Sequence, residues 1–148
     1  MQSKSIDPIL NSVVEWAESC GDILAVALVG SWARGTAHAN SDIDLMFLTP
    51  DPRKYQISQE WMHEIGWKAP GCKVKHWQDK NYGIVWSRHV YLKAGTAIEF
   101  SFGASTWAEV QPIDRGTLGV VKDGCAILYD PAKILAKLIA AAKMVPGE

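Results

Sequence analysis

The sequence is poor in cysteine and lacks a long hydrophobic run. Its three cysteines, Cys20, Cys72 and Cys125, are an odd number at wide intervals, which matches neither a zinc motif nor a disulfide framework. The longest apolar run, Ile23 to Val29, is far too short to cross a bilayer. No basic segment followed by an apolar signal core stands near Met1. We therefore expect a cytoplasmic protein with reduced thiols and no membrane partner.

Net positive charge is also absent. The 148 residues include 15 Lys and Arg against 16 Asp and Glu, which gives a formal net charge of −1. Proteins that bind long nucleic acid through many phosphate contacts generally carry a basic surface, so nucleic acid is not an expected partner. The length suits one ordinary domain with a real core. We predict a single domain over residues 1–148.

The apolar run from Ile23 to Val29 stops abruptly at Gly30-Ser31. This pattern predicts a buried strand that ends in a tight turn, followed by a short helix from Ala33 to about Ala39. The N–H groups of the turn and of the first helical turn have no intrahelical acceptors, and the helix dipole adds partial positive charge. The segment therefore favours a bound phosphate group.

Two acidic residues open the next apolar strand, in Ser41-Asp42-Ile43-Asp44. Side chains alternate along a strand, so Asp42 and Asp44 are expected on one face while Ile43 points into the core. Carboxylates this close repel each other unless a cation lies between them. Hard divalent ions suit such ligands, and Mg²⁺ is the usual ion in phosphoryl chemistry. Taken alone, either motif is equally typical of a turn or a capped loop.

Together these segments resemble the nucleotidyltransferase superfamily related to DNA polymerase β, especially its small standalone members, the minimal nucleotidyltransferases. The family pattern is a hydrophobic strand, Gly-Ser, about ten residues and Asp-x-Asp. Here ten residues, 32–41, separate Ser31 from Asp42, and the favoured Ala-Arg-Gly occupies 33–35. The resemblance implies the polymerase β-like α/β (α+β) fold, a mixed, curved sheet with helices packed mainly on one face.

A third carboxylate lies in the apolar segment 96–102. In an extended strand Ile98, Phe100 and Phe102 share one face, and Glu99 lies on the other. By this pattern alone, Glu99 could be a solvated residue on an edge strand. The family has a third acidic residue on a later strand beside the Asp-x-Asp strand, and Glu99 matches that position.

The resemblance also implies a reaction. Asp42, Asp44 and Glu99 are expected to hold two Mg²⁺ ions and to catalyse transfer of a nucleoside monophosphate, AMP from ATP, to an acceptor hydroxyl with release of pyrophosphate. Glu99 is a candidate for accepting the proton of that hydroxyl.

Three further residues are expected to bind the nucleotide. Gly30 and Ser31 are expected to hold the β and γ phosphates through backbone amides and the Ser31 hydroxyl. Arg34 has two interpretations of equal weight: it stabilises phosphate charge, or it forms a salt bridge that tethers the short helix to the sheet.

The acceptor stays open between three hypotheses. The first is a small hydroxylated molecule bound by a homodimer, as in antibiotic-modifying relatives. The second is a toxin–antitoxin pair, in which the chain adenylylates or simply binds a helical ribonuclease partner. The third is a domain that binds nucleotide or a partner without turnover, against which the intact acidic triad argues.

The rest of the chain predicts supporting elements. Asp7-Pro8 is typical of a helix start, and Asp123-Gly124 between apolar runs predicts a hairpin. Four tryptophans cluster in the middle of the chain, where a role in the core is favoured over base stacking or protein contact. The four histidines show no ligand spacing and are interpreted as surface or satisfied polar residues. The tryptophans are Trp61, Trp67, Trp77 and Trp86, and the histidines are His38, His63, His76 and His89.

Three further elements are predicted: a brief helix over Ser58–Ile65, extended stretches over Lys73–Lys93 and a last helix from Asp130-Pro131 to Pro146.

Overall fold

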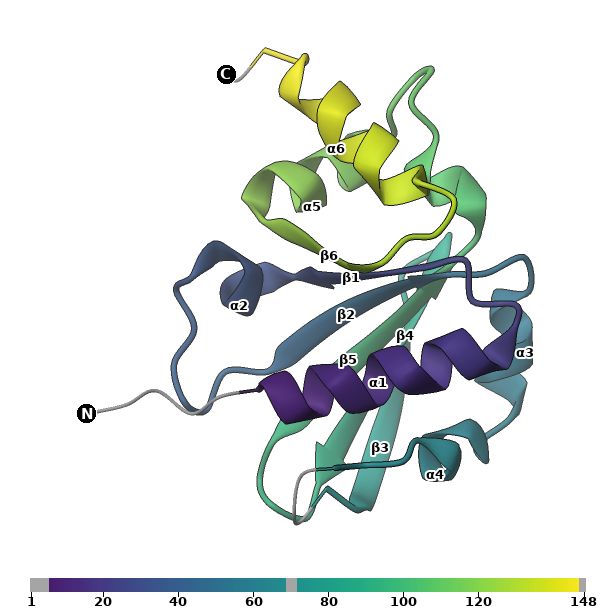
Figure 1. Ribbon diagram of the computed structural model, residues 1–148, viewed down its shortest axis with the longest axis vertical. Coiled ribbons are helices and arrows are strands. Elements are labelled where there is room, and N and C mark those ends of the chain that lie inside the picture. The colour runs from purple at the N-terminus through teal and green to yellow at the C-terminus, as the bar shows by residue number, and fades with distance from the viewer. Residues whose placement is uncertain (1–5, 69–71, 147–148) are drawn as a thin grey trace.

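A six-stranded sheet forms the centre of the structure, a computed structural model that describes residues 6–68 and 72–146 (Figure 1). The strand order is β3-β4-β5-β2-β1-β6. β2 and β5 run parallel, and the other neighbouring pairs are antiparallel. The predicted mixed sheet and α+β fold class are therefore confirmed. The strands are β1 (Ala25–Val29), β2 (Ile43–Leu48), β3 (Val74–Asn81), β4 (Val85–Leu92), β5 (Ala97–Gly103) and β6 (Cys125–Tyr129).

Helices pack against both faces of the sheet. α1 crosses one face, and α5 and α6 lie together over the edge formed by β1 and β6 (Figure 1). The larger hydrophobic cluster lies on the α1 face with α3 and α4, and a smaller cluster lies beneath α5 and α6. The helices are α1 (Asp7–Cys20), α2 (Gly30–Arg34), α3 (Pro52–Ile57), α4 (Trp61–Glu64), the 3₁₀ turn η1 (Ser105–Ala108), α5 (Arg115–Asp123) and α6 (Ile134–Lys143).

The alternation of β2 and β5 decides which face carries the acidic residues. Leu45 and Phe47 of β2 belong to the larger cluster, as does Phe100 of β5. Met46 belongs to the smaller cluster on the opposite face. Because side chains alternate, Asp44 and Glu99 lie on this second face, beside α5 rather than α1.

The short helix after β1 begins earlier than the sequence predicts. α2 covers Gly30–Arg34 instead of starting at Ala33. It ends because Gly35 adopts a left-handed conformation, with φ 79°, and its N–H donates to the Ser31 carbonyl. Gly30 and Ser31 consequently belong to the first turn of the helix.

The predicted hairpin at Asp123-Gly124 is wrong. The Asp114 carboxylate accepts a hydrogen bond from the Thr117 N–H at 3.1 Å and caps a helix, α5, that continues to Asp123. Thr117 and Val121 are spaced by one helical turn and are both buried. The Asp-Gly pair therefore joins a helix to β6 rather than two strands.

Three other helices differ from the expected boundaries. The helix predicted over Ser58–Ile65 is limited to α4, and α3 was not expected at all. An Asp-Pro pair starts α3, where the Asp51 carboxylate accepts from the Lys54 N–H at 3.3 Å. Asp130 also acts as a cap, accepting from the Leu135 N–H at 3.1 Å, so α6 begins later than predicted.

The tryptophans that cluster in the sequence belong to the core of the α1 face. Trp61 and Trp86 are buried there, and Trp67 and Trp77 pack against the same cluster. They lie on the face opposite Asp44, so the core interpretation is confirmed. None of the helices in the described ranges has the length and apolarity required to span a lipid bilayer.

Candidate functional site

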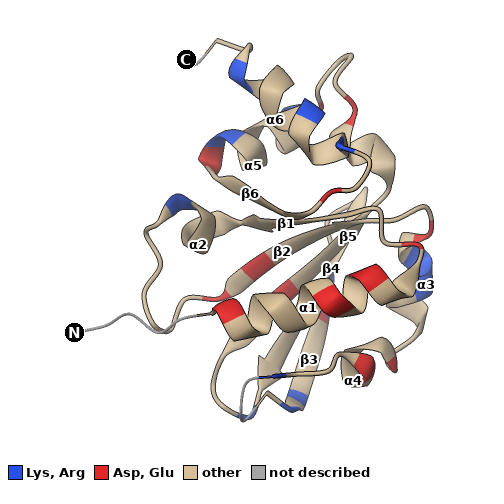
Figure 2. Ribbon diagram, in the orientation of Figure 1, with Lys and Arg blue, Asp and Glu red and all other residues tan. Residues whose placement is uncertain are grey.

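Strand pairing brings Asp44 and Glu99 together. The two residues are direct partners in the parallel β2–β5 pair, and His89 of β4 is the partner of Glu99 on its other side. Acidic positions accordingly lie side by side on β2 and β5 (Figure 2). The sheet thus places two of the three predicted metal ligands on adjacent strands, although they are far apart in the sequence.

Gly30 lies directly against the Asp44 carboxylate. The residue has φ +74°, a conformation that favours glycine, and a Cβ atom added there would lie 2.3 Å from Oδ2 of Asp44. No other residue type fits this position without displacing the carboxylate. The Gly-Ser motif and the Asp-x-Asp motif therefore meet at an atomic contact.

The environment of Asp44 disfavours its negative charge. Partial burial, and then the charges of Glu99 and Asp42, raise the pKa of Asp44 from 3.8 to about 6, with His89 acting in the opposite direction. Repulsion between these carboxylates favours the binding of a cation or a proton at Asp44.

Asp42 lies beside His89, one of the histidines that the sequence predicts to be surface or satisfied polar residues. The buried Nε2 atom of His89 is 3.1 Å from Oδ2 of Asp42. No hydrogen bond joins the two groups, so the contact is an ion pair only when the imidazole is protonated. The predicted surface or satisfied polar role of His89 is therefore wrong, because its ring is mostly buried and no hydrogen bond satisfies Nε2.

Arg34 forms a salt bridge with Asp123, the last residue of α5. Both side chains are substantially exposed, and the contact ties the short helix to α5 rather than to the sheet. Gly124 supports the same packing, because a Cβ there would lie 2.9 Å from Cγ of Arg34. The predicted phosphate contacts of Gly30, Ser31 and Arg34 stay predictions.

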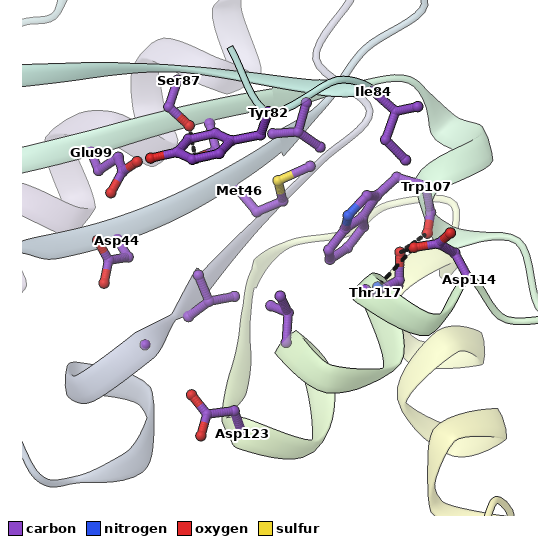
Figure 3. A pocket seen from close by; sticks show the side chains of 16 residues that line it. Asp44, Met46, Tyr82, Ile84, Ser87, Glu99, Trp107, Asp114, Thr117 and Asp123 are labelled. Atoms are coloured by element: carbon purple, nitrogen blue, oxygen red, sulfur yellow. Dashed lines mark hydrogen bonds between the residues drawn. The ribbon is translucent and has the colours of Figure 1, made fainter. Parts of the chain in front are cut away.

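A pocket of about 470 Å³ extends from these carboxylates along the sheet. Asp44 and Glu99 lie at one end, and Trp107 and Ile84 lie at the other (Figure 3). Tyr82 reaches over the sheet toward Glu99 from the turn between β3 and β4 (Figure 3). The volume lies within the usual range of small-molecule sites.

Magnesium suits the donor set by its chemistry. Three carboxylates offer hard oxygen ligands, and the raised pKa of Asp44 reports a repulsion that a divalent cation would relieve. Within the described residues, no group of three or more His, Cys, Asp or Glu side chains is gathered as a ready metal site. Asp44 and Glu99 form a close pair, whereas Asp42 lies beside His89, so the three carboxylates do not form a closed cluster.

Sequence reasoning missed several residues around the carboxylates. His89 could have been found, because the alternation of β4 places it on the same face as Ser87, which lines the pocket. Trp107 and Val120 had no such signal: they come from η1 and α5, and only the packing of these elements brings them to the pocket.

The chain is similar to a known protein family. A family model described as a nucleotidyltransferase domain matches residues 10–90, which is more than half of the chain. The matched range includes Gly30, Ser31, Asp42 and Asp44 and ends before β5, α5 and α6. No curated protein matches the chain.

Proposed function

Because the chain belongs to the nucleotidyltransferase domain family, we propose that it transfers AMP from ATP to an acceptor hydroxyl. The observation that supports this activity best is the contact between the two motifs. Gly30 leaves room for the Asp44 carboxylate, and Asp44 is the direct strand partner of Glu99. The Gly-Ser turn and a carboxylate pair are thereby held side by side, which supports the proposed phosphate contact next to the proposed metal ligands.

Asp42, Asp44 and Glu99 are the residues that would hold Mg²⁺, and we propose two ions. Members of the family generally use divalent metals. When bound, such ions neutralise phosphate charge and lower the pKa of the attacking hydroxyl. Asp42 serves this role once its carboxylate leaves the neighbourhood of His89.

The chain's own residues then orient the two substrates. Gly30 and Ser31 hold the β and γ phosphates, and Arg34 adds positive charge beside them. The acceptor oxygen forms a bond to the α-phosphorus while the bond between that phosphorus and the bridging oxygen breaks. Pyrophosphate departs with the bonding electron pair, and the hydroxyl proton passes to the Glu99 carboxylate and then to solvent.

Calorimetric titration tests the proposal. A non-hydrolysable ATP analogue is titrated with Mg²⁺ and with EDTA into the unmodified protein, into Asp44→Asn with Glu99→Gln, and into Glu109→Gln as an exposed acidic control. We expect metal-dependent binding in the unmodified protein and the control, and its loss in the double variant. Pyrophosphate release should fall by roughly 100-fold or more in the double variant. Equal binding in EDTA, or in the double variant, contradicts the proposed site.

Absence of nucleotide binding in the unmodified protein would instead favour a non-catalytic role. Some members of the family are not catalysts, and a chain of that kind would only bind a partner, such as the helical ribonuclease of a toxin–antitoxin pair.

A further inference from the structure

The strand order determines the side from which an acceptor approaches, given the proposed transfer. In an in-line displacement the attacking oxygen lies opposite the leaving group. Gly30 follows β1, Asp44 lies on β2 and Glu99 lies on β5, in this order across the sheet. With pyrophosphate at Gly30, the acceptor oxygen comes from the side of β5 and β4. The pocket reaches that side, where Ser87 of β4 and Ser101 of β5 line it, and it also extends to Gly30 and α5.

The floor of this half of the pocket offers polar groups only close to the carboxylates. The hydroxyls of Ser87 and Ser101 are hydrogen-bonded to each other at 2.6 Å, beside Glu99. Farther along, Met46 and Val85 line the pocket with apolar surface. A ligand with a hydroxyl at one end and an apolar body matches this arrangement.

The far end of the pocket combines apolar and aromatic side chains with Thr117 and Asp114 (Figure 3). Trp107 is buried and presents its ring at the far end of the pocket (Figure 3). Ile84 and Tyr82 are 69% and 57% exposed, although large apolar side chains in the described chain are mostly buried. Both belong to the segment between β3 and β4, which forms the rim of the pocket. A flat ring bound here would cover these side chains and gain their hydrophobic contact.

The described lining offers an anionic acceptor no positively charged side chain as a partner. The carboxylates that line the pocket are Asp44, Glu99, Asp114 and Asp123, and the described lining includes no Lys, Arg or His. Asp114 is engaged as the cap of α5 and Asp123 by Arg34, but neither arrangement brings a positive charge into the lining. Even with Mg²⁺ bound at Asp44 and Glu99, a negatively charged acceptor would meet no Lys, Arg or His side chain in the described lining.

We propose that the acceptor is a small phenol or alcohol with a flat, largely apolar body and no negative charge, held over β5 and β4 between Ile84 and Trp107. This inference rests on the proposed nucleotidyl transfer and names its substrate class. The acceptor oxygen becomes bonded to the α-phosphorus, pyrophosphate leaves, and the proton goes to Glu99. Ile84 and Tyr82 then determine specificity.

Three probes with the same 4-hydroxyphenyl ring test the charge preference: tyrosol is neutral, tyramine is cationic and 4-hydroxyphenylacetate is anionic. Glycerol serves as a polar alcohol without a ring. Pyrophosphate release is followed with ATP and MgCl₂. We expect kcat/KM for tyrosol and tyramine to exceed that for 4-hydroxyphenylacetate by at least ~10-fold, and glycerol to be the poorest acceptor. A preference for the anion or for glycerol overturns the inference.

A matched pair of variants tests the position. Ile84→Lys places a positive charge on the rim, and Ile57→Lys places the same charge at a side chain that is 74% exposed on α3, against the other face. Both sites are exposed, so the fold should tolerate both changes. We expect Ile84→Lys to shift the ratio of 4-hydroxyphenylacetate to tyramine by about tenfold toward the anion, and Ile57→Lys to leave it unchanged. An unchanged ratio in Ile84→Lys overturns the proposal.

Nucleotide binding, measured by titration on the same samples, distinguishes failure of the acceptor class from failure of the proposed transferase activity. If ATP binds with Mg²⁺ but none of the probes is modified, and saturation-transfer NMR detects no bound probe, the acceptor class is wrong and the transferase proposal stands. If ATP does not bind to the unmodified protein, the transferase proposal fails and the acceptor inference fails with it.

Discussion

Replacement of Gly30 by alanine tests whether the two motifs act as one unit. The added Cβ would lie 2.3 Å from Oδ2 and 3.2 Å from Cγ of Asp44, whereas real Cβ contacts essentially never fall below 3.0 Å. The Asp44 carboxylate must therefore turn away from its position beside Glu99. We expect Gly30→Ala to abolish metal-dependent ATP binding without touching any acidic residue.

The expected loss of stability has two parts. A left-handed backbone costs an alanine about 1–2 kcal/mol, and the steric overlap with Asp44 adds about 1–3 kcal/mol. Gly35→Ala is the matched control, because Gly35 has φ +79° but no atom within 4 Å of the added Cβ. Gly35→Ala should lower the free energy of unfolding by the backbone part alone and leave ATP binding intact.

A double-mutant cycle isolates the free-energy cost of the steric overlap between the added Cβ and the Asp44 carboxylate. In Asp44→Ala the side-chain oxygen is gone, and the remaining Asp44 Cβ lies at 3.4 Å from the added atom, an ordinary contact. Gly30→Ala should therefore cost about 1–3 kcal/mol less in the Asp44→Ala background than alone, as measured by urea denaturation. If Gly30→Ala matches Gly35→Ala in both stability and ATP binding, the proposed coupling between the motifs is refuted.

Three other predictions concern charged groups. Asp44→Asn should raise the free energy of unfolding of the metal-free protein by ~1 kcal/mol above pH 6. The pKa of Asp44 is about 6 in the folded state against the ordinary value of 3.8, so ionisation of Asp44 destabilises the folded state. Solvent screening makes the gain smaller than the pKa difference alone would give. That gain should disappear below about pH 4, where both states bind the proton, and denaturation curves across pH would refute it if the gain were constant. Arg88 is only 1% exposed and pairs with Asp79 at 2.8 Å. Arg88→Ala should therefore lower the free energy of unfolding, measured by urea denaturation, by about 3–5 kcal/mol. A decrease below ~1 kcal/mol would contradict the structural role of Arg88. Arg34→Gln should lower the free energy of unfolding by less than ~1 kcal/mol, because the ion pair with Asp123 is exposed. The same variant should weaken ATP binding in calorimetry. Unchanged affinity would show that Arg34 forms the salt bridge but does not bind phosphate.

The local motifs and the sheet face of the acidic residues were predictable from short-range rules. Alternation along β2 places Asp44 opposite Leu45, and the structure has Leu45 in the α1-side cluster. The Asp-Pro pairs at 7–8 and 51–52 start helices, so the same rule would have located α3, whereas Asp130-Pro131 lies in a turn that precedes α6. Asp-Gly was misleading, since its turn preference does not specify whether a helix or a strand precedes it.

The sequence by itself determined the family, the Gly-Ser and Asp-x-Asp motifs and the candidacy of Glu99, because each depends on residue types at short spacing. Only the tertiary structure decided that Glu99 pairs with Asp44, that His89 lies beside Asp42, and that Trp107 and Ile84 enclose one pocket. Strand register and the packing of α5 arise from contacts between residues far apart in the chain. A local pattern indicates which face of an element is apolar, but not which other element packs against that face.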